Sequence, residues 1–174
     1  MINNFSTNDN LNRLSLMVLQ SVAMELRDVP RRITNEEVES LPKDQQPFLY
    51  ASGNWGPGYV SIKGLVGQKR LMNELVQHLA YKVVDKFPDV NFVAGNVTGG
   101  VVPGLRLSDH LELILGRDIP FVYIRESRKK GGQMELVTGL DKNPYIKPGD
   151  KVIIAEELVN FAQTTCNSVQ VMRD

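Results

Sequence analysis

"KVIIAEELVNFAQTT", residues 151–165, carries a strong indication of the fold class. Its apolar residues 152–155 are followed by Glu156 and Glu157, and then by a small polar segment. A short continuous apolar run is typical of a strand covered on both faces, as in a parallel sheet. Open α/β folds bind their ligands at the carboxyl ends of such strands. We therefore expect the two glutamates to lie at a ligand-binding edge.

The chain from residue 48 onward alternates short apolar runs with helical patterns. Strands are predicted at 91–95, 121–125 and 151–155, and a long amphipathic helix at 67–86. This alternation is typical of βα units that build a parallel sheet. The predicted fold class is α/β, with the three strands at the centre of the sheet.

The first part of the chain has a different character. No Pro or Gly interrupts residues 8–28, where apolar residues recur near helical spacing and predict a helix with a wide apolar face. Thr34 and Glu37 have the spacing of a capping box and predict a short second helix that ends near Pro42. We expect residues 1–45 to form a helical segment that packs on a core domain, residues 46–174.

Composition limits the functions that are worth considering. Twenty Lys and Arg residues balance twenty Asp and Glu residues, so neither a nucleic acid nor an anionic membrane is an expected partner. The first ten residues lack the pattern of a signal peptide, and no apolar stretch reaches the roughly 18 residues of a membrane span. A cytoplasmic protein is expected. Cys166, the single cysteine, is predicted to be a small core residue.

Two loops could bind anions. In "GNVTGGVVPG", residues 95–104, backbone N–H groups between a strand and a helix could bind an anion, although a tight turn that needs glycine explains the pattern equally well. The basic, glycine-bounded segment 125–139 could close over a polyphosphate. Its alternative is a solvated charged hairpin.

The glutamate pair suits hydrogen bonding better than proton sharing. Adjacent residues at a strand end point to opposite sides, so Glu156 and Glu157 are poorly arranged as a shared-proton acid pair. They are better placed to accept hydrogen bonds from a sugar diol. The turn at 160–165 would then offer N–H and hydroxyl donors to a phosphate at the next helix start.

Four segments, in this order, resemble the type I phosphoribosyltransferases, most closely the orotate phosphoribosyltransferases. "ASGNWGPGYVSIKG" (51–64) is similar to their "SG, two variable residues, SP, then Y-hydrophobic-D" segment, and "AGNVTGGVVPG" (94–104) to their pyrophosphate-side loop. "YIRESRKKGG" (123–132) resembles their catalytic loop, and "KVIIAEELVNFAQTT" their motif for 5-phosphoribosyl 1-pyrophosphate (PRPP).

The resemblance implies a parallel sheet flanked by helices, an N-terminal helical hood and a homodimer whose catalytic loop reaches the neighbouring site. It implies transfer of the phosphoribosyl group of PRPP to a nitrogenous base, orotate in pyrimidine nucleotide synthesis, with release of pyrophosphate. Mg²⁺ would be bound mainly through PRPP and water, with no direct protein ligand.

The resemblance also implies roles for individual residues. Arg125 and Lys129 would neutralise the pyrophosphate, while Glu156 and Glu157 hold the ribose hydroxyls. The residues implied to bind substrate are Ser52, Gly53, Tyr59, Lys63, Thr98, Gly99, Gly100, Asn160, Ala162, Gln163 and Thr164.

Several positions depart from the family pattern. Glu126 stands where the family has lysine, Gly131 where histidine is usual, and residues 161–163 are larger than the family's Thr and Gly. The part after the last predicted helix is short, without the strand and the orotate-binding arginine that the family normally has there. The alternative is therefore a catalytically weak or inactive relative that binds a nucleotide or regulates a partner. His78 and His110 are the only histidines of the sequence, so few residues could form the Ser/His/Asp triad of a hydrolase.

Overall fold

The structure is a computed structural model. It describes residues 13–14, 16–18, 20–21, 24–28, 34–50, 53–127, 136–141, 143–159 and 162–173.

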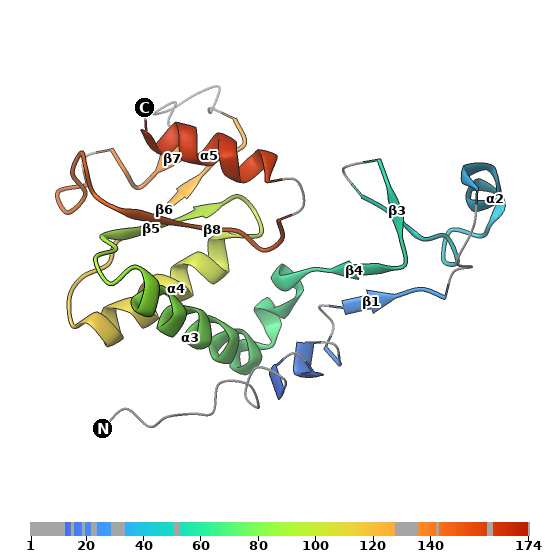
Figure 1. Cartoon of the computed structure of the whole chain (residues 1–174), viewed down its shortest axis with the longest axis horizontal. Helices are drawn as coiled ribbons and strands as arrows, with labels where there is room; N and C mark the ends of the chain where they lie inside the picture. The colour runs from blue at the N-terminus through green and yellow to red at the C-terminus, as the bar shows by residue number, and fades with distance from the viewer. Residues whose placement is uncertain are drawn as a thin grey trace.

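A four-stranded sheet, counted over these residues, lies at the centre of the fold (Figure 1). Its strands are β5 (Phe92–Asn96), β6 (Phe121–Ile124), β7 (Val137–Thr138) and β8 (Val152–Ala155) in the order β7-β6-β5-β8. β5 runs parallel to both β6 and β8, whereas β7 pairs antiparallel with β6. The three predicted strands and the α/β class are confirmed, but β8 lies at the edge of the described sheet and not at its centre.

Helices cover both faces of the sheet. α3 (Lys69–Lys86) and α4 (Val101–Leu115) pack on one face, and α5 (Gln163–Arg173) lies on the other (Figure 1). Along β5, Val93 joins the cluster with α3 and α4, while Phe92 and Ala94 join the opposite cluster. Because side chains of a strand alternate between faces, this double burial explains why residues 92–94 of the central strand are all apolar.

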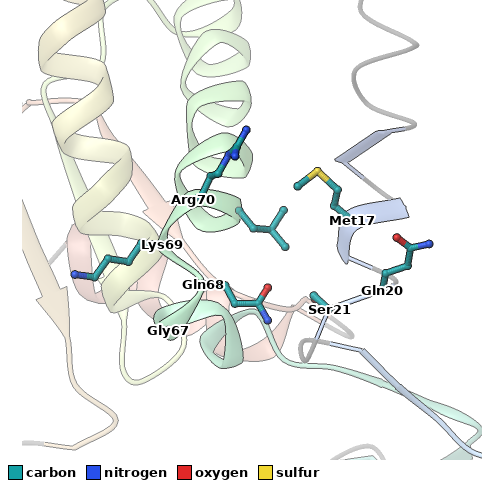
Figure 2. A pocket seen from close by; sticks show the side chains of 8 residues that line it. Met17, Gln20, Ser21, Gly67, Gln68, Lys69 and Arg70 are labelled. Atoms are coloured by element: carbon teal, nitrogen blue, oxygen red, sulfur yellow. The ribbon is translucent and has the colours of Figure 1, made fainter.

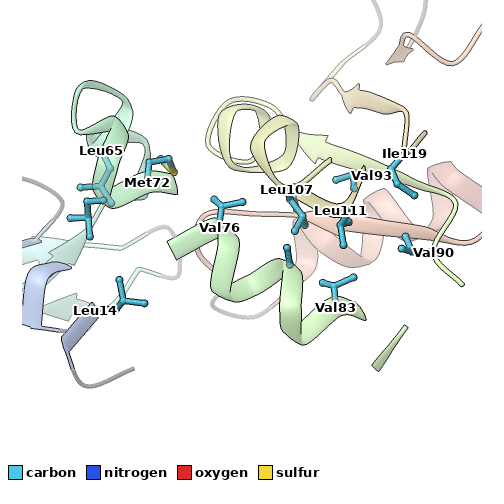
Figure 3. Packing of buried hydrophobic residues seen from close by; sticks show 13 residues of the cluster. Leu14, Leu65, Met72, Val76, Val83, Val90, Val93, Leu107, Leu111 and Ile119 are labelled. Carbon is cyan, nitrogen blue, oxygen red and sulfur yellow. The ribbon is translucent and has the colours of Figure 1, made fainter. Parts of the chain in front are cut away.

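The larger core cluster lies between α3, α4 and the sheet (Figure 3). Leu107 and Leu111 of α4 and Ile119 before β6 are almost fully buried there. Leu14 reaches the same cluster from the N-terminal part, and Leu65 reaches it from η1 (Ile62–Gly67). The predicted helix at 67–86 is confirmed by α3.

The predicted helix over 8–28 is only partly right. Residues 13–14 and 16–18 are helical, but Met24–Leu26 forms strand β1, which pairs antiparallel with β4 (Gly58–Val60). Leu26, expected on the apolar helical face, is 66% exposed. The ladder with β4 supplies non-local backbone partners, and such tertiary pairing overrides a local helical pattern.

The β1–β4 ladder continues into an arm that extends away from the sheet (Figure 1). It also contains α2 (Asn35–Ser40), β2 (Phe48–Leu49) and β3 (Trp55–Gly56), the last two paired with each other. The ladder crosses the predicted boundary between 1–45 and 46–174, and that division stays a prediction.

The capping box at the start of α2 is confirmed. The hydroxyl of Thr34 accepts from the N–H of Glu37, and the carboxylate of Glu37 accepts from the backbone N–H of Thr34. The backbone N–H of Thr34 and, as a smaller cause, the Thr34 hydroxyl both donate to the Glu37 carboxylate, and they hold the pKa of Glu37 below its usual range.

Two further observations concern the burial of Cys166 and the possibility of a membrane-spanning helix. Cys166 lies exposed on α5, so its prediction as a core residue was wrong; the inward face of α5 is occupied instead by residues such as Val171. None of the helices in the described ranges is long and apolar enough to cross a bilayer.

Candidate functional site

The carboxyl ends of β5 and β8 form the point where the sheet changes direction. The chain passes from β5 through α4 to β6 on one side, and later returns to place β8 on the other side of β5. Open α/β sheets bind ligands in the crevice at such a point. Asn96 ends β5 here, and Glu156 directly follows β8.

Glu156 is held at both carboxylate oxygens. The side-chain amide of Asn96 donates to Oε2 at 2.8 Å, and the backbone N–H of Glu157 donates to Oε1 at 2.9 Å. A carboxylate has about four lone-pair sites. Acceptor sites therefore remain on Glu156 for hydroxyl groups of a ligand.

Glu157 turns toward different partners. Its Oε2 accepts from the backbone N–H of Lys63 at 3.0 Å, and its Oε1 lies 3.4 Å from the ammonium of Lys63. The Glu157 side chain is 14% exposed, against 52% for Lys63. The two carboxylates thus have separate sets of partners, as the sequence predicted for adjacent strand-end residues.

The turn after β5 lies against the end of β8. A Cβ placed on Gly99 would lie 2.3 Å from Cδ of Glu157, so this carboxylate covers the Gly99 backbone. A Cβ on Gly100 would lie 2.1 Å from the carbonyl oxygen of Ala155. Glycine is needed at position 100 for this close backbone approach, while Thr98 is exposed at the tip of the turn.

The segment before α5 has a conformation that favours glycine. Ala162 has a φ of 58°, in the left-handed region, and its carbonyl accepts from the N–H of Cys166. Gln163 and Thr164 begin α5 and are exposed. Asn160, predicted to bind the phosphate, lies outside the described residues.

The basic segment is described only at its ends. Arg125 follows β6, where its guanidinium donates to Thr138 Oγ1 at 3.0 Å and lies over the ring of Tyr123. Glu126 is exposed. Residues 128–135, among them Lys129 and Gly131, lie outside the described residues, so the choice between a lid and a solvated hairpin stays open.

Two other predicted substrate-binding residues, Gly53 and Tyr59, lie on the arm. Gly53 has a φ of 81° in the turn between β2 and β3, and Tyr59 of β4 stacks against Phe48. In Figure 1 this turn lies away from the end of β8. Ser52 is outside the described residues. The structure therefore brings Lys63, Gly99, Gly100, Glu156 and Glu157 together, but not Gly53 or Tyr59.

A hollow of about 540 Å³ lies elsewhere, at the start of α3 (Figure 2). It is lined by Met17, Gln20 and Ser21 of the N-terminal part and by residues 67–71. It contains neither glutamate of the pair, so we base the candidate site on the strand ends. Within the described ranges, no three His, Cys, Asp or Glu side chains lie together as a metal centre requires.

Sequence reasoning missed two residues of this site, Asn96 and Ser168. Both are buried, and the Ser168 hydroxyl donates to Oδ1 of Asn96 at 2.7 Å. Asn96 carried one usable signal, since an amide directly after an apolar strand core is costly to bury without partners. Ser168 carried none.

Comparisons with known proteins give relatives named orotate phosphoribosyltransferase, although no family model matches the chain. The orotate phosphoribosyltransferase of Porphyromonas gingivalis is 30% identical over 139 residues, covering 79% of this chain and 61% of that protein. The orotate phosphoribosyltransferase of Listeria innocua is 29% identical over 132 residues, covering 76% and 58%. The chain thus spans about three fifths of the length of these curated relatives.

A solved structure extends the likeness to the fold. The UMP synthase of Leishmania donovani superposes with a TM-score of 0.61 at 18% identity, covering 91% of this chain and 27% of that one. Identity this low supports a shared fold and nothing finer. In sequence and in fold, the chain is therefore a relative of the orotate phosphoribosyltransferases, with the type I phosphoribosyltransferase fold.

Proposed function

We propose that the protein transfers the phosphoribosyl group of PRPP to orotate and releases pyrophosphate. In this reaction the C1–O bond of PRPP breaks and its electron pair leaves on pyrophosphate. A ring nitrogen of orotate supplies the pair for the new C1–N bond and releases its proton to solvent. The observation that supports the proposal most directly is the pair Glu156 and Glu157 at the switch point of the sheet, beside the Gly99–Gly100 turn.

The two carboxylates suit the charge that develops on the ribose. As the C1–O bond breaks ahead of attack, positive charge grows on the sugar ring, and fixed negative groups nearby stabilise it. Glu156 is held by two donors and keeps acceptor sites for ribose hydroxyls. This fixed orientation lowers the reorganisation needed during the reaction.

Mg²⁺ belongs to the substrate in this proposal. A diphosphate at the Gly99–Gly100 turn would lie next to the Glu157 carboxylate, which covers the Gly99 backbone. A divalent cation carried by the diphosphate would relieve this like-charge contact, with most of its ligands from phosphate oxygens and water. Lys63, which already faces Glu157, adds a second cation there.

The remaining roles rest on the sequence resemblance. The 5-phosphate would occupy the segment before α5, where the left-handed Ala162 precedes the helix start. Arg125 and Lys129 would neutralise the pyrophosphate. A homodimer and a cytoplasmic location remain predictions.

Calorimetry with Mg²⁺ and PRPP tests the proposal. The parent protein should bind PRPP, and Glu156→Gln and Glu157→Gln should each weaken binding about tenfold or more, since a charge-assisted hydrogen bond contributes about 1.5–3 kcal/mol. Glu39→Gln, at an exposed position on α2, is the control and should bind as the parent does.

A steady-state assay with PRPP and a panel of bases completes the test. Turnover with orotate supports the proposed reaction. Turnover with another base instead of orotate would identify that base as the substrate. A parent protein that binds no PRPP, or two glutamine variants that bind it with parent affinity, would refute the proposal. Binding without turnover would identify a nucleotide-binding relative.

A further inference from the structure

Asn96 is a buried amide at the carboxyl edge of the sheet. It ends the central strand β5 and is 2% exposed. Burial of an amide is costly unless its polar atoms are paired. Both side-chain atoms of Asn96 are paired, and their partners come from two different elements.

One partner is the carboxylate of Glu156. The Asn96 amide nitrogen donates to Oε2 at 2.8 Å, while the backbone N–H of Glu157 holds Oε1. The backbone bond alone would leave the carboxylate free to turn about its last torsion. The second bond, from β5, fixes its plane.

The other partner is Ser168 of α5. Its hydroxyl donates to Oδ1 of Asn96 at 2.7 Å, and Oγ of Ser168 also lies 3.0 Å from the carbonyl oxygen of Thr164. An inverted Asn96 amide would turn Oδ1 toward the ionised Glu156, which is repulsive, so the carboxylate and the hydroxyl together select one orientation. Ser168 is itself buried, with 4% of its surface exposed.

We propose that Asn96 is a positioning residue for Glu156 in phosphoribosyl transfer, and that Ser168 holds Asn96 in the orientation that this role needs. This inference rests on the proposed function. Asn96 is too deeply buried to touch PRPP, so it acts on the ligand only through Glu156. The two hydrogen bonds that join Ser168, Asn96 and Glu156 also connect two parts of the proposed site. α5 follows the segment proposed to bind the 5-phosphate, and Glu156 is the residue proposed to bind the ribose hydroxyls.

Two substitutions of different kinds test the positioning role. Asn96→Asp keeps the shape of the side chain but removes the donor and adds a like charge beside Glu156. It should weaken PRPP binding, measured by calorimetry with Mg²⁺, about tenfold or more. Ser168→Ala removes only the bond that orients Asn96 and should weaken binding less, about two- to fivefold.

Ser108→Ala is the matched control. Ser108 is equally buried at 4%, lies on α4, and donates its hydroxyl to a backbone carbonyl, that of Ile119. Its loss should lower the melting temperature much as Ser168→Ala does. PRPP affinity should stay within about twofold of the parent, because Ser108 has no link to Glu156.

A double-mutant cycle separates positioning from general destabilisation. If Asn96 acts through Glu156, the effects of Asn96→Asp and Glu156→Gln on PRPP affinity should not add, because either change already removes the fixed carboxylate. Additive effects would overturn the inference, as would parent affinity in both Asn96→Asp and Ser168→Ala. Absence of PRPP binding in the parent would overturn the proposed function itself and the positioning role with it.

Discussion

Gly99 and Gly100 mark the closest approach of the turn after β5 to the end of β8. They differ in what an added methyl group would meet. At Gly99 the obstacle is the side chain of Glu157, which can rotate, whereas at Gly100 it is the backbone carbonyl of Ala155 at 2.1 Å. Only the second obstacle requires the two strands to separate.

Gly100→Ala should therefore lower the free energy of unfolding by about 1–3 kcal/mol, the usual cost of overpacking. Gly99→Ala should cost less than about 1 kcal/mol, because it only displaces the Glu157 carboxylate from the turn. Urea denaturation of both variants measures the difference. Equal losses would show that the turn yields as readily as the side chain.

At this scale the sequence predicted the glutamates but missed the residues that hold them. Glu156 and Glu157 stand out because charged residues directly follow an apolar strand. Asn96 and Ser168 are 72 positions apart, and Asn96 is 60 positions from Glu156, so no local pattern connects them. Their pairing follows only from the sheet order and from the side on which α5 lies.

Among the elements, α5 begins in an unusual way. Ala162, directly before it, adopts a left-handed conformation that costs a residue with a Cβ about 1–2 kcal/mol. Glycine adopts the same conformation without that cost, but loses more chain entropy on folding. The two effects oppose each other at this position.

Ala162→Gly should leave the free energy of unfolding unchanged or raise it by up to about 1 kcal/mol, since relief of the backbone strain outweighs the entropy loss. Ala80→Gly is the control. Ala80 is fully buried in the interior of α3, so the same chemical change there should destabilise by about 1 kcal/mol or more. Thermal or urea unfolding compares the two, and a loss at Ala162 as large as at Ala80 would contradict the account.

Elements with a strong local pattern were predictable, and those held by distant partners were not. α3 and β8 were predicted because their apolar spacing matches their burial. β1 was missed because its partner, β4, lies more than thirty positions further along the chain. From the local sequence alone, residues 24–26 are predicted to be the end of a helix.

Over the whole molecule, the sheet separates two apolar clusters, and α4 faces the larger one. Leu111 of α4 is completely buried in that cluster, whereas Leu113, two positions later, is 80% exposed. The two residues lie on the same helix and have the same type of side chain, but they differ in burial. They give a direct measure of how much the layer between α4 and the sheet contributes.

Leu111→Ala should lower the free energy of unfolding by about 2–5 kcal/mol, from lost burial and the cavity left behind. Leu113→Ala should change it by less than about 0.5 kcal/mol, because the side chain is already in water. Chemical denaturation monitored by circular dichroism checks both. A small effect at Leu111 would mean that α4 is not firmly packed on the sheet.

The exposure of Cys166 has a practical consequence. It is the single thiol of the chain and lies on the first turns of α5, where its N–H donates to the carbonyl of Ala162. A maleimide dye can therefore be attached at one known point without an engineered cysteine. The dye would stand about one helical turn from the segment proposed to hold the 5-phosphate, so its fluorescence offers a direct optical signal of ligand arrival.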